Sequence, residues 1–112
     1  MDIGVDYYPE HWDRKDWETH ARLMEEAGIG IVRLAEFAWS RMEPREGKYD
    51  FGWLDDAIVP LRKRNIRVIL GTPTAAPPPW LVTRHPETLV VSQSGVRTEA
   101  GGRRHYCFTS PA

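Results

Sequence analysis

The sequence contains very little of three features that would place it in a specialised class of protein. It has one cysteine among 112 residues, so no disulfide can close within the chain, as is usual in a reducing compartment. No apolar run approaches the roughly 20 residues that span a bilayer, and the first residues, MDIGVDYYPEHW, lack the basic and apolar regions of a secretory signal. Fifteen basic and sixteen acidic residues leave a formal charge of −1. We therefore expect a cytoplasmic protein with neither nucleic acid nor membrane as a partner.

Several short motifs that carry chemistry are also missing. The stretch GTPTAAP does not have the spacing of a nucleotide-binding loop, which disfavours a nucleotide-binding fold. His85 and His105 lack a metal-ligand spacing such as HExxH. Cys107 has no CxxC partner, so the residues alone favour a structural or free thiol over a metal ligand.

The chain does contain a regular alternation of short apolar segments and amphipathic segments. Residues 3–7, 29–34 and 67–71 are rich in β-branched and aliphatic side chains, and we predict a strand in each. Residues 13–27 and 50–65 have apolar residues at three- and four-residue spacing, which predicts two helices. The resulting order, β-α-β-α-β, favours a parallel sheet in an α/β fold.

The ends of both predicted helices carry recognisable signals. Asp13 and Asp50 can act as N-caps, and Gly28 and Asn65 suit the left-handed position after the last turn. Pro60 lies inside the second helix, where it costs about 3 kcal/mol unless the helix kinks or divides.

Long connections follow the second and third predicted strands. Residues 36–53 are predicted to form a long loop, and loops of this length are usually functional. The proline-rich stretch 72–81 cannot join a sheet. We then expect a short helix from Pro79 to His85, stopped by Pro86, and an extended segment from Thr88 to Ser92.

Polar and aromatic side chains directly follow each predicted strand. Parallel strands of this kind occur in doubly wound sheets and in (β/α)₈ barrels, and both folds bind ligands at the carboxyl ends of their strands. A complete barrel takes about 250 residues, so this chain would hold fewer than half of its units. Aromatic rings, carboxylates and arginines together suit a sugar, which offers apolar faces and hydroxyl groups. The candidates are Asp6, Tyr7, Tyr8, Arg33, Glu36, Thr72, Thr74 and the segment RRHYC at 103–107.

Several of these candidates also have a purely structural interpretation. Glu36 can form an ion pair with Arg33 or Arg41 instead of binding a ligand. Trp39 lies in the long loop, where packing and sugar stacking are about equally favoured. Trp17 and Trp53, on the two longer predicted helices, are better interpreted as packing residues.

Four blocks, in the same order along almost the whole chain, closely resemble the start of the family 42 glycoside hydrolases. These are the β-galactosidases with a TIM-barrel catalytic domain. The blocks are GVDYYPEHW, VRLAEFAWSRMEPREGKYDFGWLD, VILGTPTAAPPPWL and GGRRHYCFTSPA.

The resemblance implies a fold and an activity. It implies the first three β/α units of a (β/α)₈ TIM barrel, with residues 1–112 as the N-terminal part of the catalytic domain, ending before strand 4. It further implies retaining hydrolysis of terminal β-D-galactosides, without a cofactor for the chemistry, by an enzyme that is often trimeric. Its two catalytic glutamates follow strands 4 and 7, so this chain is expected to contain neither and to be inactive alone.

The resemblance also suggests which residues contact the substrate. Arg103 matches an arginine that reaches the galactose, and we expect Glu36, Tyr7 and Trp39 to line the same site. Cys107 matches the first cysteine of a structural zinc site that some members have. The other cysteines of that site are missing here, so we expect no stoichiometric zinc in this chain.

Other classes of function remain open at this point. The chain could be a non-catalytic carbohydrate-binding module or a subunit-assembly module, which would bind galactose without cleaving galactosides. A redox or metal module around Cys107 is the least favoured class, because the sequence offers no partner ligands at suitable spacing.

Overall fold

The computed structural model describes residues 2–101 and 106–111. It comprises two compact units. Residues 1–36 and 51–72 form the sheet unit, and residues 37–50 and 73–112 form the loop unit. The chain leaves the sheet unit at residues 36 and 72, in both cases just after a predicted strand.

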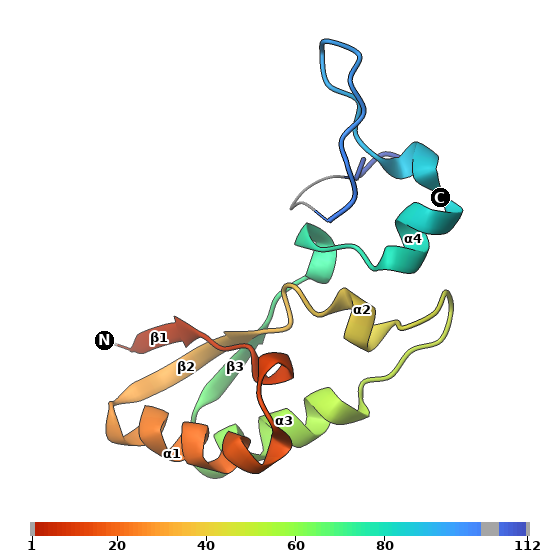
Figure 1. The fold of residues 1–112 in the computed structure, drawn as a ribbon. Helices are drawn as coiled ribbons and strands as arrows, with labels where there is room; N and C mark the ends of the chain where they lie inside the picture. Colours follow the sequence, from red (N-terminus) through yellow and green to blue (C-terminus); the bar gives the residue numbers. More distant parts are fainter. Residues whose placement is uncertain (1, 102–105, 112) are drawn as a thin grey trace. The chain divides into compact units, whose positions relative to one another are not determined.

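The sheet unit contains a parallel sheet of three strands, as the alternation of segments predicted. The strands are β1 (Ile3–Asp6), β2 (Ile29–Leu34) and β3 (Arg67–Leu70), and β2 lies in the middle (Figure 1). The register places Asp6 of β1 beside Arg33 of β2. All three strands therefore end at the same edge of the sheet.

The helix α1 (Trp17–Glu26) returns the chain from β1 to β2. It is shorter than predicted, because residues Arg14–Asp16 form a separate 3-10 turn and Asp13 makes no side-chain capping bond. A second 3-10 turn, Pro9–His11, directly follows the end of β1. The predicted end of the helix is confirmed, since Gly28 has a φ of 77°, which glycine adopts without steric cost.

The helix α3 (Gly52–Lys63) connects the loop unit back to β3. Phe51 occupies the N-cap position, so the prediction of Asp50 as the cap is wrong. The helix continues through Pro60, whose ring is buried, so packing offsets the hydrogen bond that proline cannot donate. Asn65 has a φ of 58° and ends the helix as predicted.

The core of the sheet unit lies between the sheet and these helices, which occupy the same face of the sheet (Figure 1). Val32 and Leu34 of β2 are completely or almost completely buried on that face. Trp17 of α1 and Trp53 of α3 are also buried, which confirms the prediction that these two tryptophans are packing residues.

The opposite face of the sheet, called the open face below, carries the alternate strand residues. Gly4, Ile31, Arg33 and Ile69 line a shallow hollow of about 280 Å³ there. Ile69 is half exposed. In a complete barrel, strand residues of this alternation point into the interior, where side chains fill the space.

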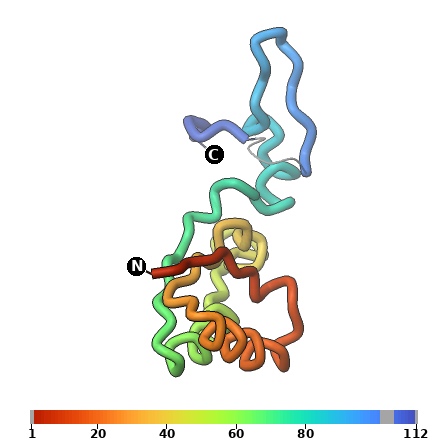
Figure 2. The backbone as a smooth tube through the Cα atoms, turned by 90° about the vertical axis from the view of Figure 1, so that its left-hand side faces the viewer, coloured from red at the N-terminus to blue at the C-terminus, as the bar shows by residue number. Residues whose placement is uncertain are grey.

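The loop unit contains the helices α2 (Trp39–Met42) and α4 (Pro79–Arg84). The long loop predicted over residues 36–53 therefore includes one short helix. His85 and Pro86 follow α4 and end it, as predicted. Residues 88–98 form a hairpin, with a bridge between Val91 and Arg97 (Figure 2).

Among the described residues, no helix is both long and apolar enough to cross a membrane.

Candidate functional site

Four polar side chains meet at the carboxyl ends of β1 and β2 and form the strand-end cluster: Asp6, Tyr8, Arg33 and Glu36. Arg33 joins the two carboxylates, because its Nε lies 3.3 Å from Asp6 Oδ1 and its Nη2 pairs with Glu36 Oε2. The predicted alternative for Glu36, an ion pair with Arg33, is therefore confirmed. The Glu36 side chain remains 15% exposed, so a ligand can still reach it.

Tyr8 holds the other oxygen of the same carboxylate. Its hydroxyl donates a hydrogen bond of 2.9 Å to Glu36 Oε1. Partial burial, the hydrogen bond to Glu36 and the nearby charges of Glu36 and Asp6 raise the pKa of Tyr8 above its ordinary value, against the opposing effect of Arg33. Tyr8 therefore stays protonated and remains a donor throughout the neutral pH range.

The backbone beside Glu36 adopts an unusual conformation and is closely packed. Ala35 has a φ of 72°, a left-handed conformation that costs a residue other than glycine about 1–3 kcal/mol. A Cβ atom on Gly71 would lie only 2.8 Å from the Cβ of Glu36 and 3.3 Å from its Cα. Residue 71 must therefore be glycine for Glu36 to occupy this position. Strained backbone of this kind is most common at functional sites.

Of the two adjacent tyrosines, the structure brings Tyr8 to Glu36 and places Tyr7 elsewhere. The Tyr7 hydroxyl lies 2.9 Å from Nδ1 of His20 on α1. Burial, followed by the charges of Asp16 and Glu10, raises the pKa of Tyr7 to about 12. The signal that could have selected Tyr8 is strand alternation, since residues i and i+2 share a face of a sheet and Asp6 points to the open face.

The strand-end cluster is chemically suited to accept hydrogen bonds from hydroxyl groups. A carboxylate has about four acceptor positions, and Tyr8 and Arg33 use one on each oxygen of Glu36. Two carboxylates against one guanidinium leave the cluster with a net negative charge. A neutral polyol that donates hydrogen bonds therefore fits the cluster better than an anion does.

The loop unit contains a second polar centre, which the sequence did not predict. Glu43 is buried, and its carboxylate accepts hydrogen bonds of 2.8 Å from the indole Nε1 of Trp39 and from the backbone N–H of Gly47. The carbonyl oxygen of Glu43 accepts a further bond of 2.8 Å from the indole of Trp80. Glu43 therefore fixes the orientation of both tryptophans.

These tryptophans line a cavity of about 600 Å³ within the loop unit. The ring of Trp39 meets that of Tyr106 edge to face, with 6.0 Å between their centres. Trp80, Phe108 and Cys107 line the same cavity. Aromatic walls of this kind suit the apolar face of a sugar ring, as well as ordinary packing.

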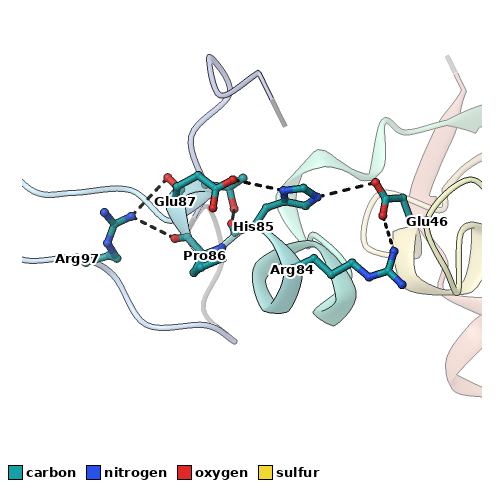
Figure 3. A network of polar contacts seen from close by, with 7 residues as sticks. Glu46, Arg84, His85, Pro86, Glu87 and Arg97 are labelled. Carbon is teal, nitrogen blue, oxygen red and sulfur yellow. Dashed lines mark hydrogen bonds and ion pairs between the residues drawn. The ribbon is translucent and has the colours of Figure 1, made fainter.

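Figure 3 shows the polar contacts around α4 and the segment that follows it. Arg84 donates a hydrogen bond of 2.5 Å to Glu46, and the Nε2 of His85 lies 3.8 Å from the same carboxylate. Arg97 donates a bond of 3.1 Å to the carbonyl oxygen of Pro86. Exposed ion pairs contribute about 0–1 kcal/mol each, so we interpret this network as a structural brace.

Comparison with known sequences shows which family combines these features. The sequence profile of glycoside hydrolase family 42, described as "Beta-galactosidase", matches residues 6–112. The chain belongs to family 42 of the glycoside hydrolases. The predicted resemblance is thereby confirmed, and the parallel sheet is the first part of the family 42 barrel.

Individual family 42 proteins match nearly the whole chain. The β-galactosidase BgaA of Thermus sp. is 54% identical over 110 residues, which are 98% of this chain and 17% of that protein. A β-galactosidase of Thermus thermophilus is 55% identical over 109 residues, again 17% of its length. The chain thus spans about a sixth of the length of these relatives.

Solved structures agree with the family assignment. The β-galactosidase of Marinomonas ef1 matches with a TM-score of 0.92 and 47% identity, over 99% of this chain and 17% of that structure. The enzyme of Halorubrum lacusprofundi matches with a TM-score of 0.93 and 45% identity, over 98% of this chain and 16% of that structure.

The family resemblance also suggested roles for Arg103 and Cys107. Arg103 lies outside the described residues, so its proposed contact with galactose stays a prediction. Hydrogen bonds from the side chain and backbone of Thr109 and from the backbone of Ser110 lower the pKa of the Cys107 thiol, which favours the thiolate that binds metals. The described residues contain no group of three His, Cys, Asp or Glu side chains that could hold a metal ion.

Proposed function

We propose that residues 1–112 form the first three β/α units of a β-galactosidase barrel, and that the strand-end cluster binds the galactosyl unit of the substrate. The main support for this proposal is the arrangement of Tyr8, Arg33 and Glu36 at the carboxyl ends of the strands, where barrel enzymes bind their ligands. The names of the Thermus relatives support the choice of a β-galactoside.

Each residue has a proposed role in binding. Glu36 accepts hydrogen bonds from sugar hydroxyls, and Arg33 holds its carboxylate in place. Arg103 donates further charge-assisted hydrogen bonds to the galactose. Trp39, whose indole N–H is held by Glu43, offers its ring for stacking.

The chemical step of the proposed reaction requires groups from the rest of the barrel. Retaining hydrolysis uses two carboxyl groups about 5–5.5 Å apart, one as acid and base and the other as nucleophile. In the strand-end cluster, Arg33 bridges Asp6 and Glu36, which suits the binding of hydroxyl groups. The family resemblance implies that the two catalytic glutamates follow strands 4 and 7, so we assign both to barrel units outside residues 1–112.

Several family properties stay predictions for this chain. They are a cytoplasmic location and a homotrimer, and for zinc the prediction is that this chain binds no stoichiometric ion although Cys107 matches one ligand of the zinc site that some members have. None of them is needed for the proposed binding role.

A chimeric enzyme tests the proposal. Residues 1–112 would replace the matching segment of the full-length Thermus sp. BgaA, with which they share 54% identity over 110 residues. Hydrolysis of a chromogenic β-galactoside is measured for the chimera, for its Glu36→Ala variant and for the 112-residue chain alone.

We expect an active chimera, a loss of kcat/KM of about tenfold or more in Glu36→Ala, and no turnover by the 112-residue chain. A folded but inactive chimera, or full activity after Glu36→Ala, would contradict the proposal. Specific galactose binding by the 112-residue chain, together with an inactive chimera, would favour the non-catalytic carbohydrate-binding module instead.

A further inference from the structure

The segment that carries Tyr8 is anchored on both sides. The backbone N–H of Tyr7 donates a hydrogen bond of 3.0 Å to the carbonyl oxygen of Arg33, which extends the pairing of β1 with β2 by one residue. On the other side, the indole Nε1 of the buried Trp17 donates a bond of 3.0 Å to the carbonyl oxygen of Pro9. Because these neighbours are fixed to the sheet and to α1, the backbone of Tyr8 has little freedom to move.

Glu36 is approached by a different group on each side. Arg33 pairs with Oε2, Tyr8 donates to Oε1, and Gly71, the residue directly after β3, lies close to the Glu36 Cβ. Arg33 alone would leave the carboxylate free to rotate about its terminal torsion, which is broad for glutamate. The bond from Tyr8 fixes the plane of the carboxylate and so determines where its remaining acceptor positions point.

We propose that Tyr8 is a positioning residue of the galactoside site, which acts by holding the Glu36 carboxylate in the orientation that accepts substrate hydroxyls. This inference rests on the proposed function, because it requires Glu36 to contact the sugar. Tyr8 itself needs no contact with the substrate. Its raised pKa keeps the hydroxyl protonated, so its hold on Glu36 persists across the neutral pH range.

The test is a double-mutant cycle in the chimeric enzyme. The unmutated chimera, Tyr8→Phe, Glu36→Ala and the double variant are compared by kcat and KM for a chromogenic β-galactoside. Thr19→Val is the control, because it likewise removes one hydroxyl group, here from an exposed position on α1 and away from the strand-end cluster. The melting temperature of each variant shows whether its fold is retained.

We expect Tyr8→Phe to lower kcat/KM about tenfold, with most of the loss in KM, while the control Thr19→Val leaves kcat/KM unchanged. In the Glu36→Ala background, Tyr8→Phe should cause no further loss, because the group that Tyr8 positions is then absent. In the Glu36→Gln background, which retains the Oε1 acceptor, Tyr8→Phe should still cause part of its loss in kcat/KM. A merely structural role would lower the melting temperature without this coupling.

The inference is overturned if Tyr8→Phe leaves kcat/KM unchanged in a chimera that Glu36→Ala impairs, or if the two losses multiply in the double variant. An inactive chimera, or a chimera unaffected by Glu36→Ala, would instead show that the proposed function has failed, and the inference would fail with it.

Discussion

The substitution Gly71→Ala adds a single carbon atom directly after β3, where the chain passes close to Glu36. The new Cβ would lie 2.8 Å from the Glu36 Cβ, about 0.7 Å closer than the ~3.5 Å at which two carbon atoms make normal contact. It would also lie 3.3 Å from the Glu36 Cα and 3.4 Å from the carbonyl oxygen of Leu34. Because two of these three atoms belong to the backbone, a change of side-chain rotamer cannot relieve the contact.

The consequence should appear in both stability and substrate binding. Overpacking of this kind costs about 1–3 kcal/mol of folding free energy. Moving Glu36 away by about 0.7 Å would stretch its bond to Tyr8, now 2.9 Å, beyond normal hydrogen-bond length. A misplacement of about 1 Å can cost an enzyme about a hundredfold in rate, so we expect kcat/KM of the chimera to fall between tenfold and a hundredfold.

The assay compares Gly71→Ala with Gly30→Ala in the chimeric enzyme, by kcat/KM and by melting temperature. Gly30 is the matched control because it also lies at a strand, in β2, and a Cβ there would meet only Asp2 Oδ1, at an ordinary 3.4 Å. Gly30→Ala should therefore retain activity. Equal activity and stability of Gly71→Ala and Gly30→Ala would show that the close approach of residue 71 to Glu36 affects neither folding nor substrate binding, which would refute this prediction.

Three other changes test separate parts of the account. Arg103→Ala in the chimera should lower kcat/KM at least tenfold, since a charge-assisted hydrogen bond is worth about 1.5–3 kcal/mol; unchanged kinetics would remove Arg103 from the site. Glu43→Ala should lower the melting temperature, because each donor left unpaired at Trp39 and Gly47 costs about 1–3 kcal/mol; an unchanged melting temperature would contradict the buried role of Glu43. Metal analysis of the 112-residue chain should find no stoichiometric zinc, and one tightly held ion per chain, lost in Cys107→Ser, would show that this prediction is wrong.

Local signals predicted the sheet unit well. The apolar run of β2 and the left-handed residues Gly28 and Asn65 are set by short-range chemistry, and the structure confirms all three. The sequence left open whether the helix kinks or divides at Pro60, because the continuous helix depends on the packing around the buried ring, which sequence spacing does not reveal. The short helix α2 was missed because four residues carry too little periodicity to identify it.

The residues of the strand-end cluster were predicted from the sequence, but the contact between Tyr8 and Glu36 was not. Glu36 and Arg33 follow β2 or lie at its end, so their convergence with residues after β1 came from topology alone. The contact between Tyr8 and Glu36 depends on which face each tyrosine occupies after β1. Glu43 gave no signal, because its burial depends on contacts with Trp39, Gly47 and the distant Trp80 that only the folded loop unit provides.

A crystal structure of the chimeric enzyme with bound galactose would test the central claim most directly. We predict that a galactose hydroxyl lies within hydrogen-bond distance of the Glu36 carboxylate, about 2.5–3.0 Å, with the Tyr8 hydroxyl still bonded to Oε1. Galactose bound in the active site without any contact to Glu36 would contradict the account.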